Sequence, residues 1–157
     1  MAIEEGKAAP TFTLKDQDGN KVALKDYRGK TVVVYFYPKD DTPGCTKEAC
    51  GFRDHKKKFD KMDTVILGIS PDAADSHIRF IDKFKLPFTL LSDPDKKVME
   101  KYGAWGEKMM YGKKMIGVIR STTIIDANGK VLKHWKKVPK AADHPAKVLE
   151  FLESQPG

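Results

Sequence analysis

The feature that most constrains the fold is an uninterrupted apolar run between Thr31 and Pro38, Val32-Val33-Val34-Tyr35-Phe36-Tyr37. A strand of this composition is apolar on both faces, which is typical of a central strand flanked by other strands and covered by helices. The segment from Thr64 to Ser70 has the same character. Two such strands predict a sheet that is parallel at its centre, within an α/β fold.

The remaining elements follow from hydrophobic periodicity and from turn signals such as Asp18-Gly19-Asn20 and Ala127-Asn128-Gly129. Residues 103–112 are predicted to form a loop. In chain order, the predicted elements are a hairpin of 12–14 and 22–24, a strand at 31–37, a helix at 45–62, a strand at 64–70, a helix at 75–84, an extended piece from 90, a short helix at 93–102, strands at 116–126 and 131–135, and a helix at 144–153. This order predicts one α/β domain over residues 1–157: a three-layer sandwich of thioredoxin-like type, with a central mixed sheet and an N-terminal hairpin.

The composition is that of an ordinary globular protein, with 40% hydrophobic and 32% charged residues. No apolar run approaches the roughly 20 residues that a membrane-spanning helix requires. Residues 1–7 show no apolar signal region and are acidic early, so we expect no secretory or transit peptide. We therefore expect a cytoplasmic protein with no membrane contact; a mature organelle protein would look the same.

The excess of basic over acidic residues has two interpretations. The net charge is +7 and the pI is about 9.3, but the lysines are spread along the chain, most densely at 56–58 and 130–140. A solvated lysine surface explains this pattern, and an anionic partner is the alternative. A basic nucleic-acid-binding domain rests on the charge alone, because no aromatic–basic interleaving or groove-reading motif accompanies it.

The segment that carries chemistry lies where the central strand passes into a helix. Thr42 is a plausible N-cap, and Pro43 suits the first helical position. Cys45 then falls in the first turn, where free N–H groups and the helix dipole favour a thiolate. The alternative for Cys45 is a buried small apolar residue.

Cys50 is the second of the two cysteines and follows Cys45 by five positions. In an ideal helix this spacing separates the Cα atoms by roughly 8–9 Å. A disulfide needs less than about 7 Å. Either the two cysteines never pair, or the first helical turns unwind during each catalytic cycle.

Arg120 lies in a segment that is apolar on both faces, Val118 to Ile125. A buried arginine needs an anionic partner, and a Cys45 thiolate with Glu48 on the same helix would supply one. An exposed arginine at a strand end is the alternative, and the sequence does not decide between them.

The sequence resembles the peroxiredoxins through Pro38-x-x-x-Thr42-x-x-Cys45, which matches that family's Pro-x-x-x-Thr/Ser-x-x-Cys motif. The wider stretch 35–46, together with 102–107 and 119–122, is similar to the bacterioferritin comigratory protein, or PrxQ, subgroup. The likeness covers nearly the whole chain. One departure is Thr123, where phenylalanine is expected and where looser packing around Arg120 could follow.

The resemblance implies a role for each residue. Cys45 would be the peroxidatic cysteine and Cys50 the resolving one. Thr42 would bind the thiolate and the peroxide, while Pro38 would shield the site from water. Arg120 would hold the thiolate and the charge that develops as the O–O bond breaks, and Glu48 would orient Arg120.

The same resemblance implies substrates and partners. Hydrogen peroxide and alkyl hydroperoxides would be reduced through a Cys45 sulfenic acid and an intramolecular Cys45–Cys50 disulfide. Thioredoxin or a glutaredoxin-like protein would recycle that disulfide. No metal, haem or flavin cofactor is expected, nor nucleic acid, and a monomer is expected. Met109-Met110-Tyr111 is a candidate for substrate or partner contact, with ordinary surface packing as the alternative.

Two further alternatives use the same cysteines. A thioredoxin-type disulfide reductase would share the fold, but its chemistry uses Cys-x-x-Cys, which the gap here does not match. A zinc module would combine Cys45, Cys50, His55 and His77, yet one rising helix points the first three in different directions. The four histidines are otherwise predicted to lie on the surface.

Overall fold

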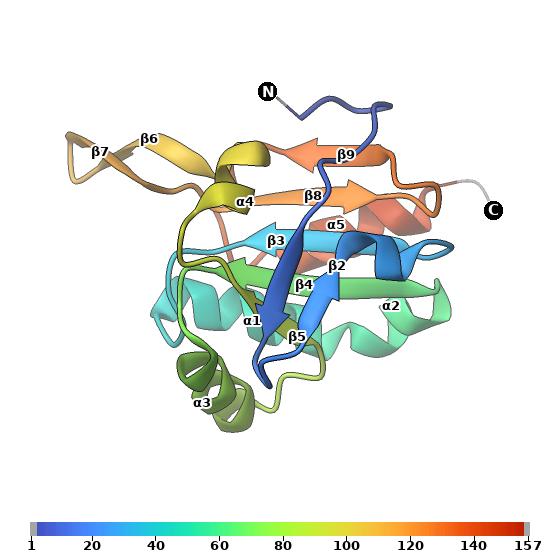
Figure 1. The fold of residues 1–157 in the computed structure, drawn as a ribbon, viewed down its shortest axis with the longest axis horizontal. Coiled ribbons are helices and arrows are strands. Elements are labelled where there is room, and N and C mark those ends of the chain that lie inside the picture. The colour runs from blue at the N-terminus through green and yellow to red at the C-terminus, as the bar shows by residue number, and fades with distance from the viewer. Residues whose placement is uncertain (1–2, 156–157) are drawn as a thin grey trace.

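The computed structural model describes residues 3–155, and its framework is one seven-stranded sheet with a separate two-stranded sheet. The strands are β1 (Thr13–Asp16), β2 (Lys21–Ala23), β3 (Thr31–Phe36), β4 (Thr64–Ser70), β5 (Thr89–Ser92), β6 (Trp105–Met110), β7 (Lys113–Val118), β8 (Ser121–Ile125) and β9 (Val131–Trp135). The large sheet has the order β2-β1-β5-β4-β3-β8-β9 (Figure 1). Strands β3, β4 and β5 are parallel, and β1–β2 and β8–β9 are antiparallel pairs at the two edges.

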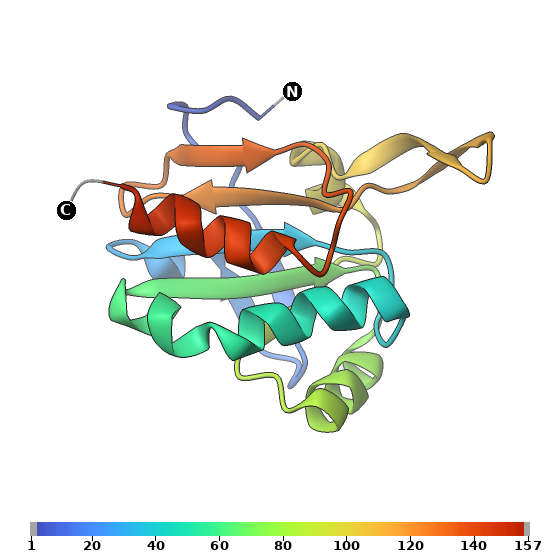
Figure 2. The ribbon, with the colours of Figure 1, turned by 180° about the vertical axis from the view of Figure 1, so that it is seen from behind.

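Helices cover the two faces unequally. They are the 3-10 helix η1 (Leu24–Tyr27) and the α-helices α1 (Pro43–Asp54), α2 (Lys56–Lys61), α3 (Ala74–Phe84), α4 (Lys97–Lys101) and α5 (His144–Glu153). Figure 2 shows α1, α2 and α5 lying across one face, while Figure 1 shows η1 and α4 on the other. The predicted three-layer α/β sandwich with its N-terminal hairpin is therefore confirmed.

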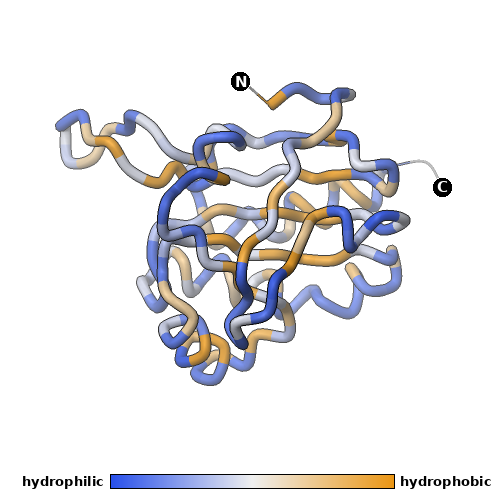
Figure 3. The backbone as a smooth tube through the Cα atoms, in the orientation of Figure 1, coloured by the Kyte–Doolittle hydropathy of each residue, from blue (hydrophilic) through white to orange (hydrophobic). Residues whose placement is uncertain are grey.

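Alternation along β3 builds a separate core on each face of the sheet. Val32, Val34 and Phe36 pack toward α4, whereas Val33 and Tyr35 pack toward α1 and α5. All five are at most 2% exposed, as expected for a strand that is apolar on both faces. Figure 3 shows the hydrophobic stretches concentrated in these inner strands.

Four predicted elements differ from the structure, and one of them, the helix predicted at 93–102, is the shorter α4, Lys97–Lys101. The predicted loop at 103–112 contains β6, which pairs with β7 in a hairpin that projects from the body (Figure 1). The predicted strand at 116–126 is divided between β7 and β8, with Arg120 in the interruption. The predicted helix at 45–62 is divided at His55 into α1 and α2.

None of the helices formed by residues 3–155 is both long enough and apolar enough to cross a bilayer.

Candidate active site

Cys45 is held where the carboxyl end of β3 passes into α1. Pro43 occupies the first turn of α1, where its missing N–H group costs no hydrogen bond. Thr42 is the N-cap residue, and its carbonyl oxygen accepts the N–H of Thr46 at 2.8 Å. Cys45 is 1% exposed, so its sulfur lies in the first turn beneath the surface, close to the positive end of the helix dipole.

Arg120 comes to this sulfur from the joint between β7 and β8. The N–H of Ile119 donates to the carbonyl oxygen of Ala104 at 2.7 Å, and the N–H of Val138 donates to that of Arg120 at 2.9 Å. With the backbone fixed on both sides, the guanidinium donates from Nη2 to Cys45 Sγ at 3.3 Å. The alternative of an exposed strand-end arginine is therefore wrong, since its side chain is 18% exposed and paired.

Glu48 is the third residue of this arrangement, with Cys45 and Arg120. It lies one turn after Cys45 on α1, is fully buried, and accepts from Arg120 Nη1 at 2.7 Å. Burial raises the pKa of Glu48 to about 7, although the charge and hydrogen bond of Arg120 act in the opposite direction. For Arg120, burial lowers the pKa, but the charges of Glu48 and Cys45 outweigh it and the net direction is upward.

Gly44 makes the approach of Arg120 possible, and the sequence analysis did not single it out. A Cβ at this position would lie 3.2 Å from Arg120 Nη2, closer than ordinary van der Waals contact. The signal was available, because a glycine directly before a nucleophile in a first helical turn suggests that another group comes close to the backbone.

Thr42 lies at the start of α1, but its side chain makes a different contact from the one expected. Its Oγ1 donates to the carbonyl oxygen of Lys39 at 2.9 Å, and it makes no side-chain capping bond to α1. The predicted N-cap position is thus correct, while the side chain stabilises the preceding loop instead. Pro38 is half-buried immediately after Tyr37.

Cys50 lies on the same continuous helix as Cys45, and both thiols are free, with Cys45 buried and Cys50 half-buried. The zinc set of Cys45, Cys50, His55 and His77 is not assembled. Within residues 3–155, the one group of such side chains close enough to share an ion is Asp40, Asp72 and His77, and it contains no cysteine.

Two histidines predicted to lie on the surface are buried instead. His77 is fully buried in α3, and His144, at the start of α5, is 3% exposed. His144 Nε2 lies 2.7 Å from Thr122 Oγ1, and burial lowers the pKa of His144 to about 4, with Lys147 and Arg120 adding to the effect. The spacing of His77 with Phe80 and Phe84 along one helix face could have indicated its burial.

Thr123 does not face the site. Alternation along β8 places it on the sheet face opposite Cys45, where its Oγ1 lies 3.0 Å from His134 Nδ1. Its difference from phenylalanine therefore affects the core on the far side of the sheet rather than the packing around Arg120.

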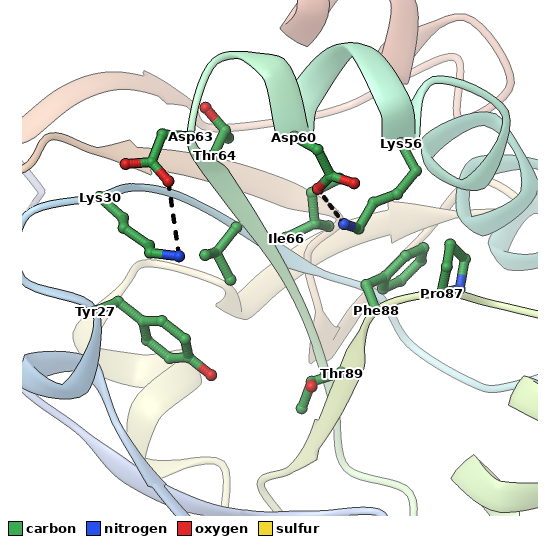
Figure 4. A pocket seen from close by; sticks show the side chains of 11 residues that line it. Tyr27, Lys30, Lys56, Asp60, Asp63, Thr64, Ile66, Pro87, Phe88 and Thr89 are labelled. Atoms are coloured by element: carbon green, nitrogen blue, oxygen red, sulfur yellow. Dashed lines mark hydrogen bonds and ion pairs between the residues drawn. The ribbon is translucent and has the colours of Figure 1, made fainter.

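A hollow of about 450 Å³ lies at the other end of the sheet, where β3 and β4 begin (Figure 4). Two ion pairs border it: Lys30 Nζ lies 3.6 Å from Asp63 Oδ1, and Lys56 pairs with Asp60. The remaining lining residues are Tyr27, Thr64, Val65, Ile66, Pro87, Phe88 and Thr89. Because its charged groups already pair with one another and Cys45 lies at the opposite strand ends, this hollow is separate from the site.

Residues 6–134 match the model of the AhpC/TSA family. The chain belongs to that family. It is 48% identical over 153 residues to peroxiredoxin Bcp of Bacillus subtilis, covering 98% of this chain and 97% of the relative. It is 46% identical to peroxiredoxin Bcp of Escherichia coli, covering 96% of both chains.

A solved structure of the bacterioferritin comigratory protein of Xanthomonas campestris superposes with a TM-score of 0.88 at 37% identity. The alignment covers 96% of this chain and 98% of that one. The resemblance to Bcp and PrxQ peroxiredoxins is thereby confirmed, as is the thioredoxin-like peroxiredoxin fold. The chain is a peroxidase of the thiol-dependent peroxiredoxin type.

Proposed function

We propose that Cys45 is the nucleophile with which this peroxiredoxin reduces hydrogen peroxide and alkyl hydroperoxides. The observation that carries the proposal is the guanidinium of Arg120, which donates both to Cys45 Sγ, at 3.3 Å, and to the buried Glu48, at 2.7 Å. The Xanthomonas campestris relative is described for alkyl peroxide reduction, which supports the same substrate class here.

In the proposed chemistry, the Cys45 thiolate attacks the terminal oxygen of the hydroperoxide. The S–O bond forms as the O–O bond breaks, the sulfur is oxidised to a sulfenic acid, and the leaving oxygen takes up a proton to become water or an alcohol. Arg120 faces the sulfur and is placed to stabilise the negative charge that moves onto the peroxide oxygens. Because Glu48 already holds Arg120, this stabilisation needs no rearrangement.

Cys50 is proposed to resolve the sulfenic acid. Its thiol would attack the Cys45 sulfur, forming an intramolecular disulfide and releasing water, and thioredoxin or a glutaredoxin-like protein would then return both cysteines to thiols. Both residues lie on one continuous helix, in which their Cα atoms are about 8–9 Å apart by ideal geometry. A disulfide requires a Cα–Cα distance of less than about 7 Å, so the start of α1 unwinds in this step.

The hairpin of β6 and β7 is the proposed contact for a protein partner. Met109 and Tyr111 are 65% and 96% exposed, so ordinary packing does not account for them. Arg120 lies two residues after the end of β7, which supports a partner contact near the base of this hairpin. We further propose that residues 1–157 are one domain acting as a cytoplasmic monomer.

A peroxide-consumption assay with thioredoxin and its reductase tests the assignment of Cys45. We expect Cys45→Ser to abolish turnover. Cys50→Ser, the matched control in the same helix, should consume about one equivalent of peroxide per protein and then stop with this reductant. Wild-type consumption by Cys45→Ser would overturn the assignment. Reduction of a protein disulfide without peroxide consumption would instead favour the thioredoxin-type alternative.

A further inference from the structure

The loop of residues 37–42, which joins β3 to α1, contains a buried aspartate that the peroxidase chemistry does not use. Asp40 is 7% exposed and accepts three hydrogen bonds. Tyr37 Oη donates to Oδ1 at 2.6 Å, Ser76 Oγ donates to Oδ2 at 2.8 Å, and His77 Nδ1 lies 2.7 Å from Oδ2. Ser76 and His77 both belong to α3, so this one carboxylate joins the loop to a different helix.

His77 meets an acceptor at each ring nitrogen. Its Nε2 lies 3.1 Å from the carbonyl oxygen of Leu91, which can only accept, so Nε2 carries a proton. Its Nδ1 faces the Asp40 carboxylate, and a second proton there satisfies both groups. One proton therefore lies between Nδ1 of His77 and Oδ2 of Asp40, and the pair is buried, with side chains 0% and 3% exposed.

Asp72 fixes the backbone of the same loop. Its Oδ2 accepts the N–H of Asp40 at 2.8 Å and the hydroxyl of Ser70, at the end of β4, also at 2.8 Å. The loop is thus held through both its side chain and its main chain. With these bonds in place, the side chains of Asp40 and His77 bind each other, while Asp72 binds the main chain of Asp40 and the hydroxyl of Ser70.

We propose that Asp40, Asp72 and His77 form a clamp of positioning residues that controls when Cys45 leaves its peroxide-reducing position. With the clamp closed, the start of α1 is formed and Cys45 meets Arg120. Its release lets residues 42–50 unwind, so that the Cys45 sulfenic acid reaches Cys50. The inference rests on the proposed roles of the two cysteines and adds a step that governs their exchange.

The physical basis is the cost of a buried polar group without its hydrogen-bond partner. Removing one partner of the Asp40–His77 pair leaves the other buried and unsatisfied, and opening the loop relieves that cost by admitting water. The balance between closed and open loop then shifts toward open by at least about tenfold. The peroxide step, which needs the closed state, should slow, while the disulfide step, which needs the open state, should accelerate.

The test separates the two steps by rapid mixing with one equivalent of hydrogen peroxide, followed by quenching and mass measurement of sulfenic acid and disulfide. In Asp40→Asn and His77→Asn we expect disulfide formation at least about tenfold faster and peroxide reduction slower. The double variant removes both partners of the buried hydrogen bond, so its rates should lie closer to wild type than the product of the single effects. Ser76→Ala, which removes one hydrogen bond from a hydroxyl, should change both rates in the same directions by about threefold.

Lys83→Ala is the matched control, because Lys83 joins α3 to Asp41 of the same loop at 2.9 Å but is 59% exposed. It should leave both rates near wild type. Equal slowing of both steps, or no change in Asp40→Asn, His77→Asn and Ser76→Ala alike, would overturn the clamp while leaving Cys45 as nucleophile. The Cys45→Ser assay tests the nucleophile separately, so the two failures are distinguishable.

Discussion

Arg120 Nη2 lies 3.3 Å from Cys45 Sγ, although the two residues are 75 positions apart in the chain. The contact depends on two elements: the segment between β7 and β8, which carries Arg120, and the first turn of α1, which carries Cys45. The second nitrogen of the same guanidinium is occupied by Glu48, which is fully buried on the turn that follows Cys45. The charge facing the sulfur is therefore held in place before peroxide arrives.

Replacing Arg120 tests this contact directly. We expect Arg120→Ala to slow the peroxide step by about 100-fold, the scale seen when one preorganised transition-state donor is removed. Arg120→Lys keeps a positive charge but cannot donate to Cys45 and Glu48 with one planar group, so an intermediate rate is expected. Single-turnover consumption of hydrogen peroxide is the measurement. Equal rates in wild type and Arg120→Ala would show that the contact contributes nothing to catalysis.

Glu48 should make stability depend on pH. Its pKa is raised by burial from 4.5 to about 7, so the folded protein binds this proton more tightly than the unfolded chain. Its stabilising contribution is therefore fully present below pH 4.5 and is lost as the pH rises through about 7. Glu48→Gln stays neutral throughout, so relative to wild type its free energy of unfolding should improve between pH 5 and pH 8.

Urea unfolding of both proteins at intervals across that range measures the difference. Glu150→Gln, on the exposed side of α5, is the control for replacing a carboxylate that is open to water. A pH-independent difference between Glu48→Gln and wild type would show that Glu48 titrates equally in the folded and unfolded chains.

Replacing Gly44 should lower the activity without lowering the stability. A Cβ there would lie 3.2 Å from Arg120 Nη2, and Arg120 cannot retreat without lengthening its contacts with Cys45 or Glu48. We expect Gly44→Ala to slow the peroxide step by about tenfold. The helix itself should gain from alanine, by roughly 0.5–1 kcal/mol, so the melting temperature should not fall. A large loss of stability, or an unchanged rate, would contradict this account.

The central sheet could be predicted because the residues of each inner strand are apolar on both faces, which indicates burial on both sides. The apolar faces of β3 and β4 and the turn glycines of the edge hairpins are local signals. The β6–β7 hairpin was missed because it projects from the body, where Met109, Lys113 and Lys114 all face solvent and no alternation arises. The division at His55 was missed because no glycine or proline marks it.

At the site, the sequence placed Cys45 and Thr42 correctly at the helix start, since capping patterns are local. It left Arg120 undecided, because its burial depends on a joint held by contacts with Ala104 and Val138. His77 was assigned to the surface for a similar reason: its partner Asp40 comes from a loop 37 positions away. Contacts between segments that are distant in the chain could not be predicted from the sequence alone.

Oxidation to the Cys45–Cys50 disulfide should loosen the protein locally. The bond closes a loop of only a few residues, so the entropy it removes from the unfolded chain is small. This gain is opposed by the loss of helical structure at the start of α1, which is one continuous helix from Pro43 to Asp54 in the reduced state. Cα atoms about 8–9 Å apart must come within about 7 Å, which regular helix geometry does not allow.

Unwinding also removes buried contacts, because Ala49 and Phe52 of α1 are 0% exposed and pack into the core on this face of the sheet. Hydrogen exchange should therefore rise at residues 42–55 in the disulfide form, while β3 and β4 stay protected by their pairing with each other. The melting temperature should fall or stay level, and Cys50→Ser treated with the same peroxide is the control that cannot form the bond. Slower exchange in this segment together with a higher melting temperature would mean that the cysteines pair without unwinding, and the role proposed for the Asp40 clamp would fail with it.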